Sequence, residues 1–103
     1  MKLVQASDFT ADTAWAAMEL ARIPDATVRL HWTDQPYIWH VNDGTEAFVD
    51  LDGLVDMHVR KSDEVSVYEL TPGVVFVAEV GDEHVAHPRG AARILVVEQV
   101  GSL

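Results

Sequence analysis

The chain contains no cysteine and few basic residues. Without cysteine in its 103 residues, disulfide frameworks and thiolate metal sites are excluded, so a metal would need imidazole and oxygen ligands. Only 7 Lys and Arg stand against 17 Asp and Glu, which gives a formal net charge of -10. Nucleic-acid binding depends on clustered cations that displace counterions from phosphates, so a nucleic-acid partner is disfavoured.

Long apolar runs are missing as well. No segment approaches the ~20 apolar residues of a membrane span, and the N-terminal sequence has no apolar stretch of signal-peptide length. We therefore expect a cytoplasmic protein with no membrane partner. The length fits a single domain, residues 1–103, built around one core.

The order of residue types predicts mostly strands. Residues 7–24 carry cap residues and helix formers before a proline, which predicts a short N-terminal helix, with helix and first strand within about 1–25. From about residue 26 to 100, polar and apolar residues alternate with the period of two typical of half-buried strands. Asp52-Gly53 lies between two such runs and predicts a hairpin turn. Seven or so short strands separated by turns indicate an antiparallel sandwich or barrel.

A cluster of polar residues is expected at the stretch IWHVNDGTEAFVDLDG. In an extended chain His40 and Asn42 share one face of their strand. With a short turn at NDGT, Glu46 could face them from the next strand, with Phe48 and Asp50 on its own side. A buried polar cluster of this kind needs hydrogen-bond partners or a metal to offset its desolvation.

At these residues the sequence resembles the small single-domain cupins. The first cupin motif has His-x-His, three or four residues, a Glu, six residues and a Gly; here His40, Asn42, Glu46 and Gly53 keep that spacing with Asn for the second His. The second motif has a Gly, five residues, Pro-x-Gly, two residues and a His; residues 73–84 keep it, with Glu79 replacing Pro and His84 in place. The resemblance spans about residues 27 to 100.

The resemblance implies an all-β cupin barrel, a double-stranded β-helix or jelly roll, with a divalent metal inside. Carried over position by position, the metal ligands would be His40, Glu46 and His84, and Asn42 would stand at the usual fourth-ligand position. An Asn carbonyl is a weaker ligand than imidazole, but two imidazoles and a carboxylate suffice for Fe, Mn, Ni or Zn. A metal site and a metal-free polar pocket therefore both remain open.

The remaining polar residues are assigned as follows. Asp50 either adds a second carboxylate to a pocket with Asn42 and Phe48, or is a strand-end residue that reaches water. His87 is interpreted as a surface or rim residue rather than a replacement ligand, and His58 and His31 as lying outside the site. Core or dimer contacts, rather than a substrate-stacking set, are expected for the aromatic residues Trp15, Trp32, Trp39, Tyr37 and Phe76.

Three hypotheses for function follow. The first is a metal-dependent oxygenase or isomerase acting on a small polar metabolite, for which no catalytic residue beyond the ligands is named. The second is a non-catalytic module that binds a small molecule in the same cavity. The third is a structural homodimer, which would cover the edge strands of a short barrel. A small-molecule ligand and a homodimer are the expected partners.

Overall fold

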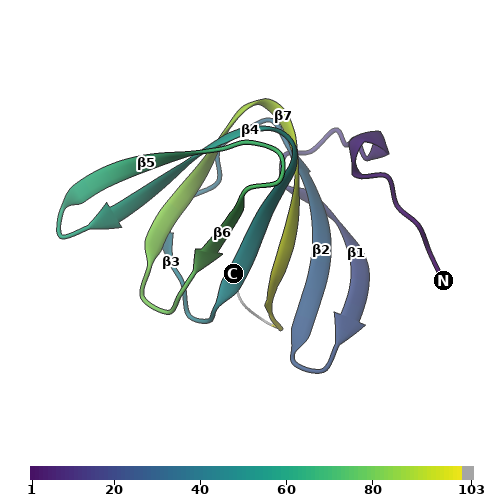
Figure 1. Ribbon diagram of the computed structural model, residues 1–103, viewed down its shortest axis with the longest axis horizontal. Helices are drawn as coiled ribbons and strands as arrows, with labels where there is room; N and C mark the ends of the chain where they lie inside the picture. Colours follow the sequence, from purple (N-terminus) through teal and green to yellow (C-terminus); the bar gives the residue numbers. More distant parts are fainter. Residues whose placement is uncertain (101–103) are drawn as a thin grey trace.

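A computed structural model describes residues 1–100, and these form an almost entirely β structure (Figure 1). The elements are a 3-10 turn η1 (Ala6–Asp8) and the strands β1 (Ala16–Ile23), β2 (Ala26–Thr33), β3 (His40–Val41), β4 (Glu46–Lys61), β5 (Glu64–Leu70), β6 (Val75–Ala78) and β7 (Glu83–Gln99). The expected all-β class is confirmed. In the described part of the chain no helix has the length and apolar character to cross a membrane. The single domain over 1–103 stays a prediction, and its last three residues lie outside the described part.

The two long strands β4 and β7 hold the fold together. The sheet order is β1-β2-β7-β4-β5, with β3 added on β7 and β6 on β4. The first half of β4 pairs with β6 and the end of β7, whereas its second half pairs with β5 and the beginning of β7. Figure 1 shows both strands arching over the molecule, with β1 and β2 on one side and β3 and β5 on the other. Each long strand therefore belongs to both layers of a jelly roll.

A bulged bend at Gly53 lets β4 pass from one layer to the other. The pairing with β7 shifts register on both sides of Asp52, and Gly53 has a φ of +84°. A Cβ at Gly53 would lie 2.4 Å from the Ala91 carbonyl oxygen, so only glycine fits without movement of the backbone. The predicted Asp52-Gly53 hairpin is therefore wrong. The positive φ is present, but the chain continues forward because both flanks pair with the same strand.

The N-terminal segment departs from the expected helix. Only the three-residue turn η1 is helical, and the helix-forming residues further on make strand β1. β1 pairs with β2 from Ala16 opposite Trp32 to Ile23 opposite Ala26, with an irregularity between Glu19 and Ala21. Local propensity is a weak preference, and the hydrogen bonds offered by the edge of β2 override it.

The apolar core lies between the layers around the bend. It comprises Phe48, Val55, Met57, Val59, Leu70, Ala86, Ala92, Ile94 and Val96, with Trp15 and Phe76 packed against it. Val55, Met57 and Val59 form an inward row of β4, which leaves His58 on the opposite face. Beyond Phe48, towards the start of β4 and the end of β7, the buried side chains become polar. That end of the interior holds the candidate site.

Candidate functional site

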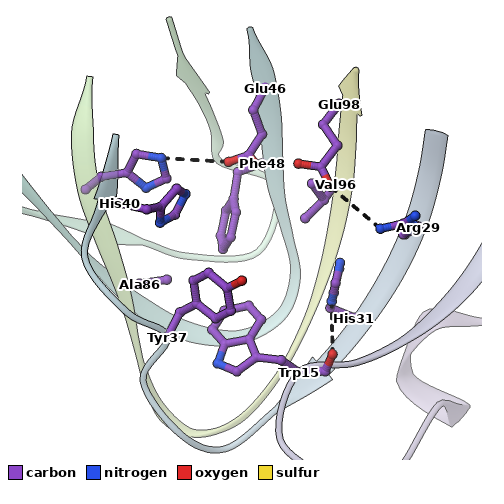
Figure 2. Close-up of a pocket in the computed structure, with 11 residues that line it drawn as sticks. Trp15, Arg29, His31, Tyr37, His40, Glu46, Phe48, Ala86, Val96 and Glu98 are labelled. Atoms are coloured by element: carbon purple, nitrogen blue, oxygen red, sulfur yellow. Dashed lines mark hydrogen bonds and ion pairs between the residues drawn. The ribbon is translucent and has the colours of Figure 1, made fainter. Parts of the chain in front are cut away.

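A cavity of about 270 Å³ opens at the polar end of the interior (Figure 2). It is lined by Trp15, Arg29, His31, Tyr37, His40, Glu46, Phe48, His84, Ala86, Val96 and Glu98. Figure 2 shows two polar sides across an apolar and aromatic base. We call His40, Asn42, Glu46 and His84 the metal corner, and Trp15, Arg29 and His31 the Arg29 wall. Glu98 lies between these two sides.

The metal corner brings together the three residues expected as ligands. His40 on β3 is the register partner of His84 on β7, and their ring centroids are 4.3 Å apart. Glu46 begins β4, and one ligand atom from each of the three residues lies within 4.8 Å of the other two. Ligand bonds of about 2.1 Å allow two donors around one ion to be at most ~4.2 Å apart. Small side-chain movements would therefore close the three donors around a cation.

The tautomer of His40 is fixed by a backbone hydrogen bond. Its Nδ1 lies 3.1 Å from the Ile38 carbonyl oxygen, which can only accept, so Nδ1 carries the proton and donates. Nε2 therefore keeps its lone pair. That atom is buried and has no hydrogen-bond partner among residues 1–100. An imidazole fixed through Nδ1 with a free Nε2 is the arrangement that metal-binding histidines commonly have, so His40 fits a metal.

His84 is held differently, through Asn42. The Asn42 amide nitrogen donates to the Gly44 carbonyl at 2.9 Å, so its Oδ1 is the acceptor that meets His84 Nε2 at 2.5 Å. His84 Nε2 therefore carries the proton and donates it to Asn42. The same nitrogen lies 3.9 Å from the Glu46 carboxyl oxygen. The lone pair falls on Nδ1, which is buried and unpartnered in the described part of the chain. Ligation through Nε2 would require the Asn42 hydrogen bond to break and the proton to move.

Two carboxyl groups face each other at the edge of the corner. Glu46 and Glu98 are register partners on β4 and β7, and both are buried. Burial and then a hydrogen bond with Glu98 raise the pKa of Glu46 to about 8. Burial, followed by the neighbouring His40, lowers the pKa of His84 to about 4, so this imidazole is neutral at pH 7. The carboxyl pair therefore holds a proton near neutral pH, in a position where a cation could replace it.

The Arg29 wall was missed by the sequence analysis. Arg29 and His31 reach the cavity from β2, and Trp15 from the segment before β1. The assignment of His31 outside the site is wrong, because alternation showed which residues share a face of β2 but not which face is enclosed. Trp15 and Tyr37, expected only as core or dimer contacts, also line the cavity with ring centroids 5.2 Å apart. Glu98 had one sequence signal, a carboxylate inside the apolar run ILVVEQV.

The other assigned residues fall into three places. Phe48 lines the cavity, and Asn42 contacts His84 at its corner. Asp50 is fully buried, so the interpretation that it reaches water is wrong, but it does not line the cavity. Its Oδ1 accepts from the Asp52 backbone at 3.1 Å, its Oδ2 has no partner in residues 1–100, and burial raises the pKa of Asp50 to about 6. His58 and His87 contact each other away from the cavity, with ring centroids 4.2 Å apart.

Comparison with known proteins identifies the fold. No family model and no curated protein matches the sequence. Among solved structures, a cupin-2 domain protein from Shewanella frigidimarina aligns with a TM-score of 0.77 and 22% identity over 90% of this chain and 86% of its own. A cupin superfamily protein from Desulfitobacterium hafniense aligns with a TM-score of 0.79 and 16% identity over 97% and 91%. A hydroquinone 1,2-dioxygenase solved with Fe3+ aligns with a TM-score of 0.77 and 15% identity over 87% of this chain and 29% of its own.

Proposed function

The chain has the cupin fold, and on that basis we propose that it binds a divalent metal through His40, Glu46 and His84 and acts on a small polar metabolite. The observation that carries the proposal is the buried, unpartnered Nε2 of His40, on a residue whose ligand atoms lie close to those of Glu46 and His84. Leaving such an atom without a partner costs free energy that a cation would recover. A cupin-fold dioxygenase with iron offers a parallel on the same fold.

The donor set limits the metal and the chemistry. Two imidazoles and one carboxylate suit Fe(II), Mn, Ni or Zn and leave coordination positions for a ligand. Such a metal would supply Lewis acidity, or a binding place for oxygen beside a chelating substrate, as oxygenases and isomerases require. The chain itself would fix His40 through Ile38, exclude water with Phe48 and Val96, and keep the Glu98 carboxyl beside Glu46.

Metal content tests this proposal directly. Protein purified without chelator or His tag is incubated with Fe(II), Mn, Ni or Zn, desalted and analysed by mass spectrometry beside His84→Ala and His87→Ala. We expect near-stoichiometric metal in the wild type and in His87→Ala, since His87 lies outside the cavity, and loss of metal in His84→Ala. Absence of metal from all three proteins, or equal metal in all three, would overturn the proposed site.

A second candidate function is a metal-free binding pocket. The hydrogen bond from His84 to Asn42 favours it, because that bond occupies the donor atom that a metal would need. In this case His40, Asn42 and His84 would hold a small molecule by hydrogen bonds. The discriminating measurement is thermal melting with candidate metabolites before and after chelation, because a ligand that binds only the folded state raises the melting temperature. An equal rise in both conditions would favour this function.

We also propose that the protein forms a homodimer through the outer face of β5 and β6. Val65 and Val67 on β5 and Val75 and Val77 on β6 are each about half exposed, and water disfavours apolar side chains in this position. β5 ends the sheet order, so its free edge could also pair with another copy. Light scattering of the wild type and of Val67→Lys tests this. A dimer that becomes a monomer in the variant is expected, and a monomeric wild type would overturn the proposal.

A further inference from the structure

The guanidinium of Arg29 is held at the cavity without a close partner. Its one ion-pair partner within residues 1–100 is Glu98, at 3.9 Å from Nη1, which is beyond hydrogen-bond distance. Glu19, the register partner of Arg29 on β1, is exposed and forms no ion pair with it in the described part. The Arg29 side chain is 38% exposed, whereas that of Glu98 is 8% exposed. A fork of N–H donors therefore faces the cavity largely uncommitted.

The His31 imidazole and the Trp15 indole add further hydrogen-bonding groups to the Arg29 wall. His31 Nδ1 lies 3.4 Å from the Trp15 carbonyl oxygen, and an oxygen there can only accept, so the other ring nitrogen of His31 is left as an acceptor. Burial lowers the pKa of His31, which keeps the ring neutral. The indole nitrogen of Trp15 is a buried donor with no partner in residues 1–100. The Arg29 guanidinium and the His31 imidazole thus offer donors and one acceptor on the same side of the cavity, and the Trp15 indole lies below them at the base (Figure 2).

The backbone conformation of Trp15 is of a kind found at binding sites. Trp15 has a φ of +61°, a conformation that a bulky residue rarely adopts. The strain is offset by packing of the ring against the core and against Tyr37. Strained residues of this kind concentrate at binding sites, where the surroundings force a side chain into position. Here the position holds the indole across the base of the cavity.

The charges of the groups that line the cavity indicate which charge a ligand should have. If the metal corner holds a divalent ion, that ion and the Glu46 carboxylate leave one positive charge, while the charges of Arg29 and Glu98 compensate each other. A cavity with one uncompensated positive charge, and a guanidinium whose ion-pair partner is beyond hydrogen-bond distance, favours a monoanion. Its volume of about 270 Å³ lies at the small end for ligand pockets.

We propose that the Arg29 wall is a carboxylate-binding subsite, which holds the anionic end of a small monocarboxylate while the apolar body of the ligand lies over Phe48 and Trp15. This substrate class rests on the proposed metal function, but Arg29 can bind the carboxylate with or without the ion. Planar guanidinium pairs with carboxylates through two parallel hydrogen bonds, so Arg29 sets the preference for this group. Trp15 and Tyr37 set the preference for a flat or narrow body.

The test uses benzoate as the probe, with benzyl alcohol and benzylamine as neutral and cationic analogues. Binding is followed by titration calorimetry and by the Trp15 indole N–H signal in nuclear magnetic resonance spectra, assigned with Trp15→Phe. The variants are Arg29→Gln and the control Arg22→Gln, since Arg22 is exposed on β1 and does not line the cavity. Each protein is titrated after metal loading and after chelation, and metal content is measured in parallel.

We expect benzoate to shift the Trp15 signal and to bind the wild type and Arg22→Gln equally, at least about tenfold tighter than Arg29→Gln, with unchanged metal content in all three. Equal benzoate affinity in Arg29→Gln, no benzoate binding in any form, or a preference for benzylamine would overturn the subsite. A wild type that binds no metal but binds benzoate through Arg29 would overturn the metal function and leave the subsite standing. Metal without Arg29-dependent binding would do the reverse.

Discussion

The two polar sides of the cavity use their hydrogen-bonding groups differently. In the metal corner the side chains are held by one another and by the backbone, as His84 is by Asn42 and Asn42 is by Gly44, but within residues 1–100 His40 Nε2 and His84 Nδ1 each keep a free lone pair that can accept. In the Arg29 wall the guanidinium and the Trp15 indole have donors to spare. The comparison teaches that the corner offers free acceptor atoms, which suit a cation, whereas the wall offers free donor groups, which suit an anionic group of a ligand.

A substitution at the Gly53 bend should destabilise the fold and thereby affect both sides of the cavity. Gly53→Ala places a Cβ against the Ala91 carbonyl at a φ of +84°, and we expect a loss of about 2–4 kcal/mol in the free energy of unfolding. Urea denaturation measures it. The control is Gly90→Ala, because Gly90 also has a positive φ, of +72°, but no atom lies within 4 Å of the added Cβ. We expect that variant to lose about 1–2 kcal/mol; equal losses would mean that the contact with Ala91 is unimportant.

Substitutions of the paired residues Glu46 and Glu98 test which of the two belongs to the metal corner. Glu46→Gln keeps the shape but removes the charge of a proposed ligand, so metal affinity should fall more than about 100-fold. Glu98→Gln is the matched change on the opposite strand, and we expect it to cost less than about tenfold, since Glu98 is not among the converging donors. Competition with a chromogenic chelator measures both. Equal losses of metal affinity would mean that Glu98 contributes to metal binding as much as Glu46 does.

Asp50 should add to the pH dependence that the buried Glu46 gives the protein. Burial raises the pKa of Asp50 to about 6 from its ordinary value of 3.8, so the folded state favours the protonated form and the contribution of Asp50 to stability declines as pH rises from about 4 to 6. Asp50→Asn should remove this contribution and leave that of Glu46. Relative to wild type it should gain about 2–3 kcal/mol near pH 7.5 and little at pH 4. Urea denaturation at both pH values measures the difference; a variant that follows the wild-type curve would contradict this assignment.

Asn42→His should increase the metal affinity of the corner while removing the hydrogen bond between His84 and Asn42. The new imidazole adds a ligand, and His84 Nε2 loses the acceptor that holds its proton. We expect metal affinity to rise about 10- to 100-fold. Asn42→Ala separates the two effects, because it releases His84 without adding a ligand. A rise as large in Asn42→Ala would mean that release of His84 is the whole effect, and no rise in either would count against ligation by His84.

The smallest effect is expected on the outer face. His58→Ala removes a ring that contacts His87, and neither residue lines the cavity. Stability should change by less than about 0.5 kcal/mol, and both metal content and benzoate affinity should stay the same. Thermal melting and metal analysis test this. A loss of metal would show that outer-face residues influence the corner.

The sequence predicted the corner better than the wall for a physical reason. His40, Asn42 and Glu46 lie within seven residues, so strand alternation and one short turn suffice to bring them together. The motif spacing adds His84. The wall depends instead on β2 lying between β1 and β7, a pairing that local alternation does not contain. Arg29 and His31 could therefore be placed on a common face of β2, but not on the enclosed face.

The two errors in secondary structure have the same origin. Residues 16–23 favour a helix locally, and Asp52-Gly53 favours a hairpin locally, but in each case pairing with a distant strand decides the outcome. β1 forms because β2 offers it an edge, and β4 continues because β7 accompanies it past the bulge. Local patterns thus predicted the class of the fold and most of its strands, while long-range pairing determined how far each strand extends.

The bulge at Gly53 also acts as a spacer between two registers. Glu46 and Glu98 belong to the pairing on one side of it, whereas His84 belongs to the pairing on the other side, opposite Val59. A chain with one residue more or fewer at the bulge could keep each half of the core packed and still separate the carboxylate from the imidazole. Variation in length at this single point is therefore a route by which such a barrel could lose or gain an ion site during evolution without losing its fold.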